Sequence, residues 1–304
     1  MISKYLLNHM IGKKALVKTS ITIFTLIVVC SYPLYASKVQ VLSRTKGGLF
    51  STFFSVLAHL TWCEKNNLTP YVYWGKDSNY YEKDSEQKTE NVWEYYFEQL
   101  SNTSYTPDQP NNGIETRNTY ASPDNFYIPF SNEYEKVLES SFRINMKKTI
   151  ERYIKIKPHI VEKMESFYHQ KLAGKNTIGI HIRGTDKSRE IQSVALENIC
   201  AKANECAKSF SSCQFFVATD EASLLAKAKT ILEGPVVTYD SYRSVDGRAI
   251  HKKQRPYHSK YMLGEEVLIE VLLLTRCNQF VHTRSNVSTA VLFFNPDLQN
   301  FVLI

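Results

Sequence analysis

The side chains best suited to chemistry lie in one short stretch, residues 177–187. The stretch begins with an apolar run, residues 178–180, that is typical of a buried strand. It ends in a group of polar side chains, namely His181, Arg183, Thr185, Asp186 and Lys187. Buried polar groups without partners are costly, so we expect this group at the carboxyl end of a parallel strand, where open α/β sheets bind ligands.

Arg183, Gly184 and Lys187 together have the composition of a phosphate site. An arginine offers a planar pair of donors to a phosphate, and a glycine lets the backbone approach closely. An ordinary strand-to-helix turn with surface charges explains the same residues equally well.

A second candidate turn lies upstream, at Gly47 and Gly48. Residues 38–43 are predicted to form a strand and residues 49–66 a helix, because apolar side chains recur there at spacings of three and four. Such a turn can hold a ligand at the helix N-terminus, although a simple tight turn also fits a Gly-Gly pair.

The second half of the chain alternates strands and helices, which predicts a doubly wound parallel sheet. Strands are predicted at 177–183, 214–219, 235–239 and 279–283, and helices at 190–207, 221–232, 261–275 and 287–294. Asp220 is predicted to cap the helix that follows it.

The first half is less regular. It contains a predicted helix at 134–154 with a break near Arg143, a helix at 159–171 that follows Pro158, and a long loop at 101–125. A boundary between the two halves is expected near 155–175.

The N-terminal segment has the charge pattern of a targeting sequence. Residues 1–18 carry four lysines and no acid, and residues 19–36 carry no charge. This pattern indicates a signal peptide or a signal anchor, with the N-terminus in the cytoplasm and the remainder across a membrane.

Composition sets broad limits. The 304 residues are 43% hydrophobic, enough for one large α/β domain or two smaller domains. The net charge of +7 favours anionic partners such as nucleotides, acidic glycans or a membrane surface, or serves only solubility. The six cysteines lack zinc-site spacing, and the group Cys200, Cys206 and Cys213 could hold a disulfide or three thiols.

Residues 178–187 resemble the His-x-Arg-Arg-Thr-Asp-Lys signature of GDP-fucose-dependent fucosyltransferases, nearest to the α-1,6-fucosyltransferase and NodZ-like group. Residues 216–225 are similar to the Ala-Thr-Asp-Asp segment of that family, and residues 280–288 to its Thr-x-Ser-x-Val segment. Gly47 and Gly48 look like its glycine-rich first turn. The protein O-fucosyltransferases are more distant.

The resemblance implies a GT-B-like α/β fold of two Rossmann-like domains. A signal peptide or anchor at 1–36 would precede an acceptor-side domain at 37–155 and a nucleotide-sugar-binding domain at 156–304. The implied activity is inverting transfer of fucose from GDP-fucose to a glycan or protein acceptor, with no metal and no cofactor besides the donor substrate. The implied location is a Golgi-like lumen, through a type II anchor, or outside the cell. No nucleic-acid partner is expected.

The resemblance also assigns roles to individual residues. Arg183 would contact the diphosphate and offset its charge as GDP leaves, and His181 would hold the nucleotide or the backbone near it. Glu270 lies near the family's nucleotide-binding acid. The remaining donor-binding candidates lie in two turns. One is the glycine-rich turn at Gly47 and Gly48, and the other opens the last helix at Ser285, Asn286 and Val287.

An inverting transfer needs a base that takes the acceptor proton, and Glu190 is the candidate with Asp186 as the second carboxylate. Asp186 more readily pairs with Lys187 or with backbone. Gly184 replaces the family's second arginine, so a phosphate contact is missing unless Lys187, Arg189 or the basic loop 243–255 supplies it. Two alternatives therefore stay open: a transferase for another nucleotide sugar, or an inactive glycan- or nucleotide-binding protein on the same fold.

Overall fold

The computed structural model describes residues 38–83, 89–103, 105, 115–129, 133–184, 194–247 and 259–303. Ser37–Ile304 form one compact unit. The predicted signal segment, residues 1–36, lies outside the described residues. Among the residues that are described, no helix is both long enough and apolar enough to cross a bilayer.

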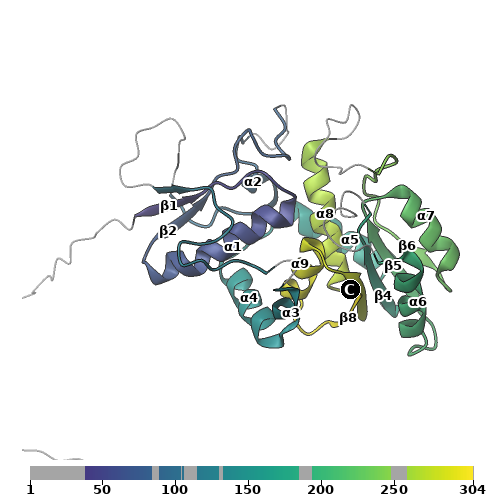
Figure 1. The fold of residues 1–304 in the computed structure, drawn as a ribbon. Helices are drawn as coiled ribbons and strands as arrows, with labels where there is room; N and C mark the ends of the chain where they lie inside the picture. Colours follow the sequence, from purple (N-terminus) through teal and green to yellow (C-terminus); the bar gives the residue numbers. More distant parts are fainter. Residues whose placement is uncertain are drawn as a thin grey trace, which may run out of the picture. The chain divides into compact units, whose positions relative to one another are not determined.

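A small parallel sheet is built from the first half of the chain (Figure 1). It contains β1 (Val39–Leu42), β2 (Thr69–Val72) and β3 (Glu115–Arg117) in the order β2-β1-β3. The helix α1 (Leu49–Lys65) joins β1 to β2 and packs against both strands. The prediction of a loop over all of 101–125 is wrong at β3, a short strand of polar sequence that pairs in parallel with β1.

Along the chain, α2 (Trp93–Tyr96) lies between β2 and β3, and β3 is followed by α3 (Tyr134–Leu138), α4 (Ser140–Tyr153) and α5 (Pro158–Lys171). The break that was predicted near Arg143 lies at Glu139, whose extended backbone separates α3 from α4. Arg143 itself sits inside α4 with a buried side chain, so its charge did not mark a helix end.

The second half of the chain forms a parallel sheet of five strands in the order β6-β5-β4-β7-β8. These strands are β4 (Thr177–Ile182), β5 (Gln214–Thr219), β6 (Val236–Val237), β7 (Gln279–Thr283) and β8 (Gln299–Leu303). From β4 the chain moves outward in one direction to β5 and β6, and it later returns to add β7 and β8 on the other side. The strand order therefore reverses between β4 and β7, and the predicted doubly wound sheet is confirmed.

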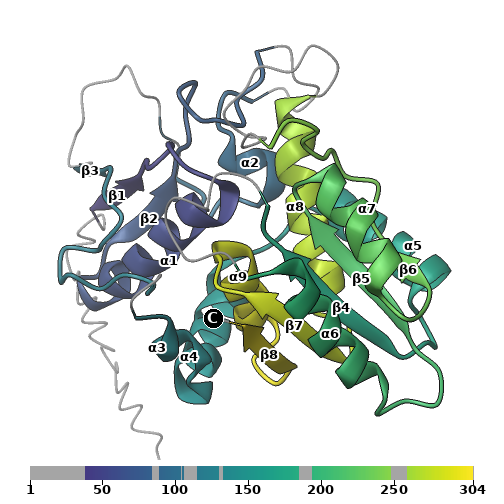
Figure 2. The ribbon, with the colours of Figure 1, turned by 45° about the vertical axis from the view of Figure 1, so that its right-hand side comes forward.

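Helices cover both faces of this sheet (Figure 2). One face packs against α6 (Leu196–Ala207) and α7 (Ala222–Ile231), through the inward-facing Ile178, Ile180 and Ile182. The other face packs against α8 (Lys260–Leu274) and α9 (Asn286–Phe294). Gly179 faces α8, where a Cβ atom would lie only 3.0 Å from side-chain atoms of Leu274 and Cys277. Glycine thus lets α8 approach the central strand.

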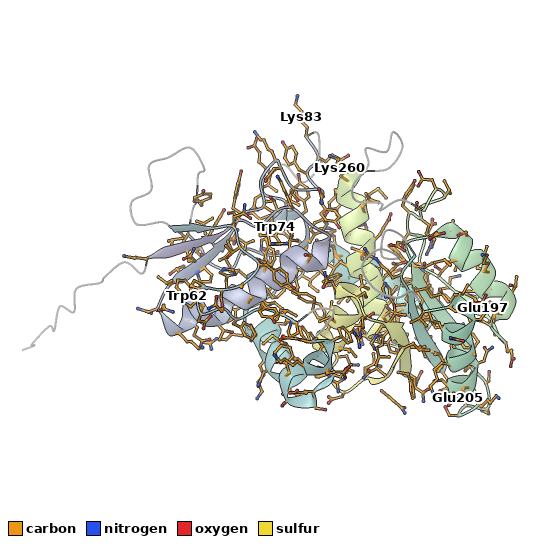
Figure 3. All side chains as sticks on the ribbon, in the orientation of Figure 1. Trp62, Trp74, Lys83, Glu197, Glu205 and Lys260 are labelled. Carbon is orange, nitrogen blue, oxygen red and sulfur yellow. The ribbon has the colours of Figure 1, made fainter. Side chains whose placement is uncertain are left out.

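One hydrophobic cluster runs through the helices of both sheets. Phe54 of α1 contacts Phe293 of α9, with ring centroids 5.6 Å apart. Trp74, labelled in Figure 3, packs edge-on against Trp93 at 5.1 Å and is fully buried. The aromatic side chains of the first half therefore serve mainly as core. The domain boundary expected at 155 stays a prediction.

The described cysteines are free thiols: Cys63, Cys200, Cys206, Cys213 and Cys277. Burial raises the pKa of Cys200 to about 11, and it also raises the pKa of Cys206 and of Cys213. Cys200, Cys206 and Cys213 are therefore three thiols and form no disulfide.

Candidate functional site

The candidate site lies at the carboxyl ends of β4 and β7, where the strand order reverses. Ligands of open α/β sheets bind in the crevice at such a point. His181 of β4 is in register with His282 of β7, so the residues that follow both strands leave the same edge of the sheet. Arg183 and Ser285 are thereby brought to one place from two separate motifs.

Ser285 is the N-cap of α9, because its Oγ accepts a hydrogen bond of 2.9 Å from the backbone N–H of Ser288. His181 Nδ1 lies 3.3 Å from Ser285 Oγ and 3.2 Å from Ser288 Oγ. All three side chains are buried. His181 therefore ties the central strand to the first turn of α9, and the Ser285 hydroxyl is engaged within that turn.

Asn286 and Val287 are the first two residues of α9. The first backbone N–H groups of a helix lack partners within it and, with the helix dipole, attract anions. The first turn of α9 carries no acidic side chain that would compete for them. The contact of Ser285, Asn286 and Val287 with a phosphate stays a prediction, which the backbone geometry here permits.

Asp220, which follows β5, fixes the turn after β4. Its Oδ1 accepts a hydrogen bond of 2.8 Å from the Gly184 backbone N–H, and its Oδ2 lies 3.6 Å from Arg183 Nε. The prediction that Asp220 caps α7 is wrong, because the N-cap residue is Glu221 and no side chain caps this helix. The Asp220 carboxylate, which follows β5, instead contacts the residues that follow the neighbouring strand β4, and it holds Arg183 at the edge of the sheet.

Gly184 is packed so closely that no larger residue fits without movement. A Cβ atom there would lie 2.5 Å from Glu221 Oε2 and 2.6 Å from Leu224 Cδ1. Side chains of Glu221 and Leu224 thus fill the space beside the Gly184 Cα atom.

A loop from the first half of the chain supports the Gly47–Gly48 turn. The Tyr80 hydroxyl accepts a hydrogen bond of 2.9 Å from the Leu49 backbone N–H, and Asn79 Nδ2 donates to the Gly47 carbonyl at 2.9 Å. Burial raises the pKa of Tyr80 to about 12, although the nearby positive charge of Arg183 acts to lower it. Tyr80 therefore holds the start of α1, directly after the Gly47–Gly48 turn.

The φ angle of +148° at Gly47 lies in the region that favours glycine. Tyr80 was not found from the sequence, because it lies within residues 75–91, a polar and charged segment. A lone tyrosine in such a segment carries no periodic signal, and its burial depends on the tertiary contact with α1.

Glu270 on α8 is buried and holds the loop after β6. Its Oε1 accepts a hydrogen bond of 2.7 Å from Ser241 Oγ and lies 3.4 Å from Arg243 Nη2. Burial raises the pKa of Glu270 to about 7, against the charge of Arg243 and the Ser241 hydrogen bond, which both lower it. The negative charges of Glu266 and Asp220 raise it further.

Arg243 is the first residue of the basic loop, and its guanidinium is engaged with the chain around it. Its guanidinium donates to the carbonyls of Ser241 at 2.8 Å and Tyr239 at 2.9 Å, and it also contacts Thr238 and Glu270. The side chain is only 10% exposed. Arg284, which follows β7 at the same sheet edge, is another described cation there, and its Nη2 lies 3.6 Å from Glu135 Oε1.

The predicted base and its neighbours lie outside the described residues. This applies to Asp186 and Glu190, to Lys187 and Arg189, and to residues 248–258 of the basic loop. Within the part of the chain that is described, no group of three or more His, Cys, Asp and Glu side chains is arranged to hold a metal ion.

The chain thus has a parallel α/β fold with an anion-attracting edge at the reversal of strand order. Solved structures with this fold include NodZ α-1,6-fucosyltransferase soaked with GDP-fucose, at 16% identity and a TM-score of 0.53 over 86% of this chain and 93% of that one. Fucosyltransferase NodZ from Bradyrhizobium matches at 17% identity and a TM-score of 0.50, over 84% of this chain and 92% of that one.

POFUT1 in complex with GDP-fucose matches at 11% identity and a TM-score of 0.51, over 88% of this chain and 98% of that one. These likenesses extend over nearly the whole of both chains and confirm the predicted GT-B-like fold. No protein-family model matches the sequence, and a search of curated proteins finds no match either.

Proposed function

We propose that the protein is a glycosyltransferase that transfers fucose from GDP-fucose to a hydroxyl group of a glycan or protein. The observation that carries the proposal is the placement of Arg183. Asp220 holds this cation at the sheet edge where strand order reverses, beside the first turn of α9. Solved structures of fucosyltransferases with a similar fold contain GDP or GDP-fucose, which supports a guanine nucleotide sugar as the donor of this protein.

The reaction would break the bond between fucose C1 and the diphosphate oxygen while an acceptor hydroxyl oxygen bonds to C1 from the opposite face. Negative charge then grows on the departing GDP, and Arg183 with the N–H groups of α9 would stabilise it. This leaves no step that needs a metal ion. The acceptor proton would pass to Glu190 or Asp186.

A turnover assay tests this proposal. The full-length protein is incubated with GDP-fucose and a panel of glycan and peptide acceptors in EDTA, and the released GDP is measured. Arg183→Ala should lower GDP release at least 100-fold, since an electrostatic contact of this kind is worth about 10²–10³ in rate. Arg276→Ala is the matched control, because Arg276 lies after α8 and pairs with Glu165 on α5.

A second candidate function is nucleotide binding without transfer. The packing at Gly184 favours it, because that position has no room for the family's second arginine. GDP binding without GDP release from any donor and acceptor pair would support this alternative. Release of UDP from a UDP-sugar, with none from GDP-fucose, would indicate transfer from another donor.

A location beyond a membrane is part of the proposal and depends on residues 1–36. Their lysine-rich start and uncharged continuation support an anchor or a cleaved signal. A protease-protection assay of the protein in microsomes tests this. An anchored or a cleaved protein would be protected inside the microsomes, whereas a protein that is not translocated would be digested.

A further inference from the structure

A cavity of about 620 Å³ lies between α1, α4 and the loop at 121–126, away from the site described above. It is lined by the second half of α1, one face of α4 and the side chains of Asp124 and Phe126. Ala58 is the first α1 residue in its wall, about 15 Å along the helix from Gly48 at a rise of 1.5 Å per residue. Figure 3 labels Trp62 on the same part of α1.

The floor of the cavity is apolar and aromatic. Phe126 and Phe142 meet with ring centroids 6.5 Å apart, and Met146 and Ala58 complete the surface. Phe142 is held from behind by an edge-on contact with Phe293 at 5.7 Å. The floor is therefore anchored to α9 and is already formed without a ligand.

The charged side chains of the rim mostly neutralise one another. Lys65 pairs with Asp124 at 3.4 Å, and Arg152 pairs with Glu64. Lys148 is the one lining charge that makes no ion pair within the described residues. With these charges paired, the rim carries little net charge, which suits a neutral ligand.

The remaining polar groups of the wall are uncharged. Thr61 lies on α1, and Asn145 and Thr149 lie one turn apart on α4. Tyr153 stands beside them, with the Arg152 guanidinium 5.3 Å from the centre of its ring. Hydroxyl, amide and phenol groups above an aromatic floor match a ligand that has both apolar C–H faces and many hydroxyls.

We propose that this cavity is a binding site for a neutral saccharide. Its volume lies within the range of about 300–1,000 Å³ that small-ligand pockets occupy. The sugar's C–H face would lie on Phe126 and Phe142, while its hydroxyls bond to Asn145 and Thr149. If the protein transfers fucose as proposed, this cavity would hold sugars of the acceptor glycan that lie far from the reacting hydroxyl. The binding of a saccharide to the cavity does not depend on the transfer function.

Saturation-transfer difference NMR on the full-length protein tests the site, with lactose, maltose, cellobiose and N-acetyllactosamine as probes. Asn145→Trp should fill the cavity from the exposed side of α4 and abolish saturation transfer. Phe126→Ala should weaken it at least fivefold. Glu151→Trp is the matched control, since Glu151 lies on the opposite face of α4 and is exposed.

Titration with GDP runs in parallel and separates the two proposals. Sugar binding that Asn145→Trp abolishes and Glu151→Trp leaves intact, with GDP binding unchanged in both, supports the saccharide site. GDP binding without any saturation transfer, or transfer that Asn145→Trp leaves unaltered, overturns it and leaves the proposed transfer function standing. Sugar binding without GDP binding upholds the saccharide site while the transferase proposal fails.

Discussion

Glu270 gives a pH dependence of stability that can be worked out from its surroundings. Its carboxyl has a pKa of about 7 in the folded protein, against an ordinary value of 4.5, chiefly because it is buried. Between pH 4.5 and about 7, the Glu270 carboxyl of the folded protein holds a proton that the unfolded chain has lost. The stabilisation is therefore fully present below pH 4.5 and is lost as the pH rises through about 7.

The size of this effect follows from the shift. One pKa unit corresponds to about 1.4 kcal/mol, so the shift from 4.5 to about 7 corresponds to at most about 3–4 kcal/mol of unfolding free energy. Glu270→Gln keeps an oxygen that can accept from Ser241 and removes the titration. We expect the variant to lose this fall in stability between pH 4.5 and about 7.

Urea unfolding at a series of pH values measures the difference between wild type and variant. Glu162→Gln, at an exposed position of α5, is the control and should keep the wild-type slope. Equal slopes for wild type and Glu270→Gln would refute the burial argument. Loss of GDP binding in Glu270→Gln at pH 6 would in addition support the nucleotide role that rests on resemblance alone.

Two further predictions concern the turns of the site. Gly184→Ala should destabilise the protein by about 1–3 kcal/mol, because its Cβ would lie 2.8 Å from Glu221 Cβ, an atom that no side-chain rotation moves away. Gly48→Ala should change the thermal midpoint little, since the nearest atom, the Tyr80 hydroxyl oxygen, is 4.0 Å away; a larger loss at Gly48 than at Gly184 would contradict both. Ser285→Ala should cost about 1 kcal/mol in urea unfolding through the lost helix cap, and an unchanged midpoint would show that the cap contributes nothing.

Much of the C-terminal sheet could be predicted from the sequence, because its strands are short apolar runs between clear turn residues. Residues 214–219 and 279–283 were predicted with the bounds that the structure has. The first half was harder to predict. The strand β3 has the polar sequence Glu-Thr-Arg, and its pairing with the distant strand β1 is not recorded in any local pattern.

The site could be predicted in part. The position of His181 and Arg183 at the end of a central strand followed from the sequence, and the structure places them there. The partners of these residues did not follow. Asp220 looked like a helix cap because capping is a local rule, whereas its contact with the turn at Gly184 joins residues 36 positions apart.

The most direct test of the proposed function is a calorimetric titration of the full-length protein with GDP, UDP and GDP-fucose in EDTA. The proposal predicts binding of GDP and GDP-fucose but not UDP, and loss of that binding in Arg183→Ala with Arg276→Ala unaffected. Binding of UDP in place of GDP would contradict the choice of donor. No binding of any of the three nucleotides would contradict the transferase proposal as a whole.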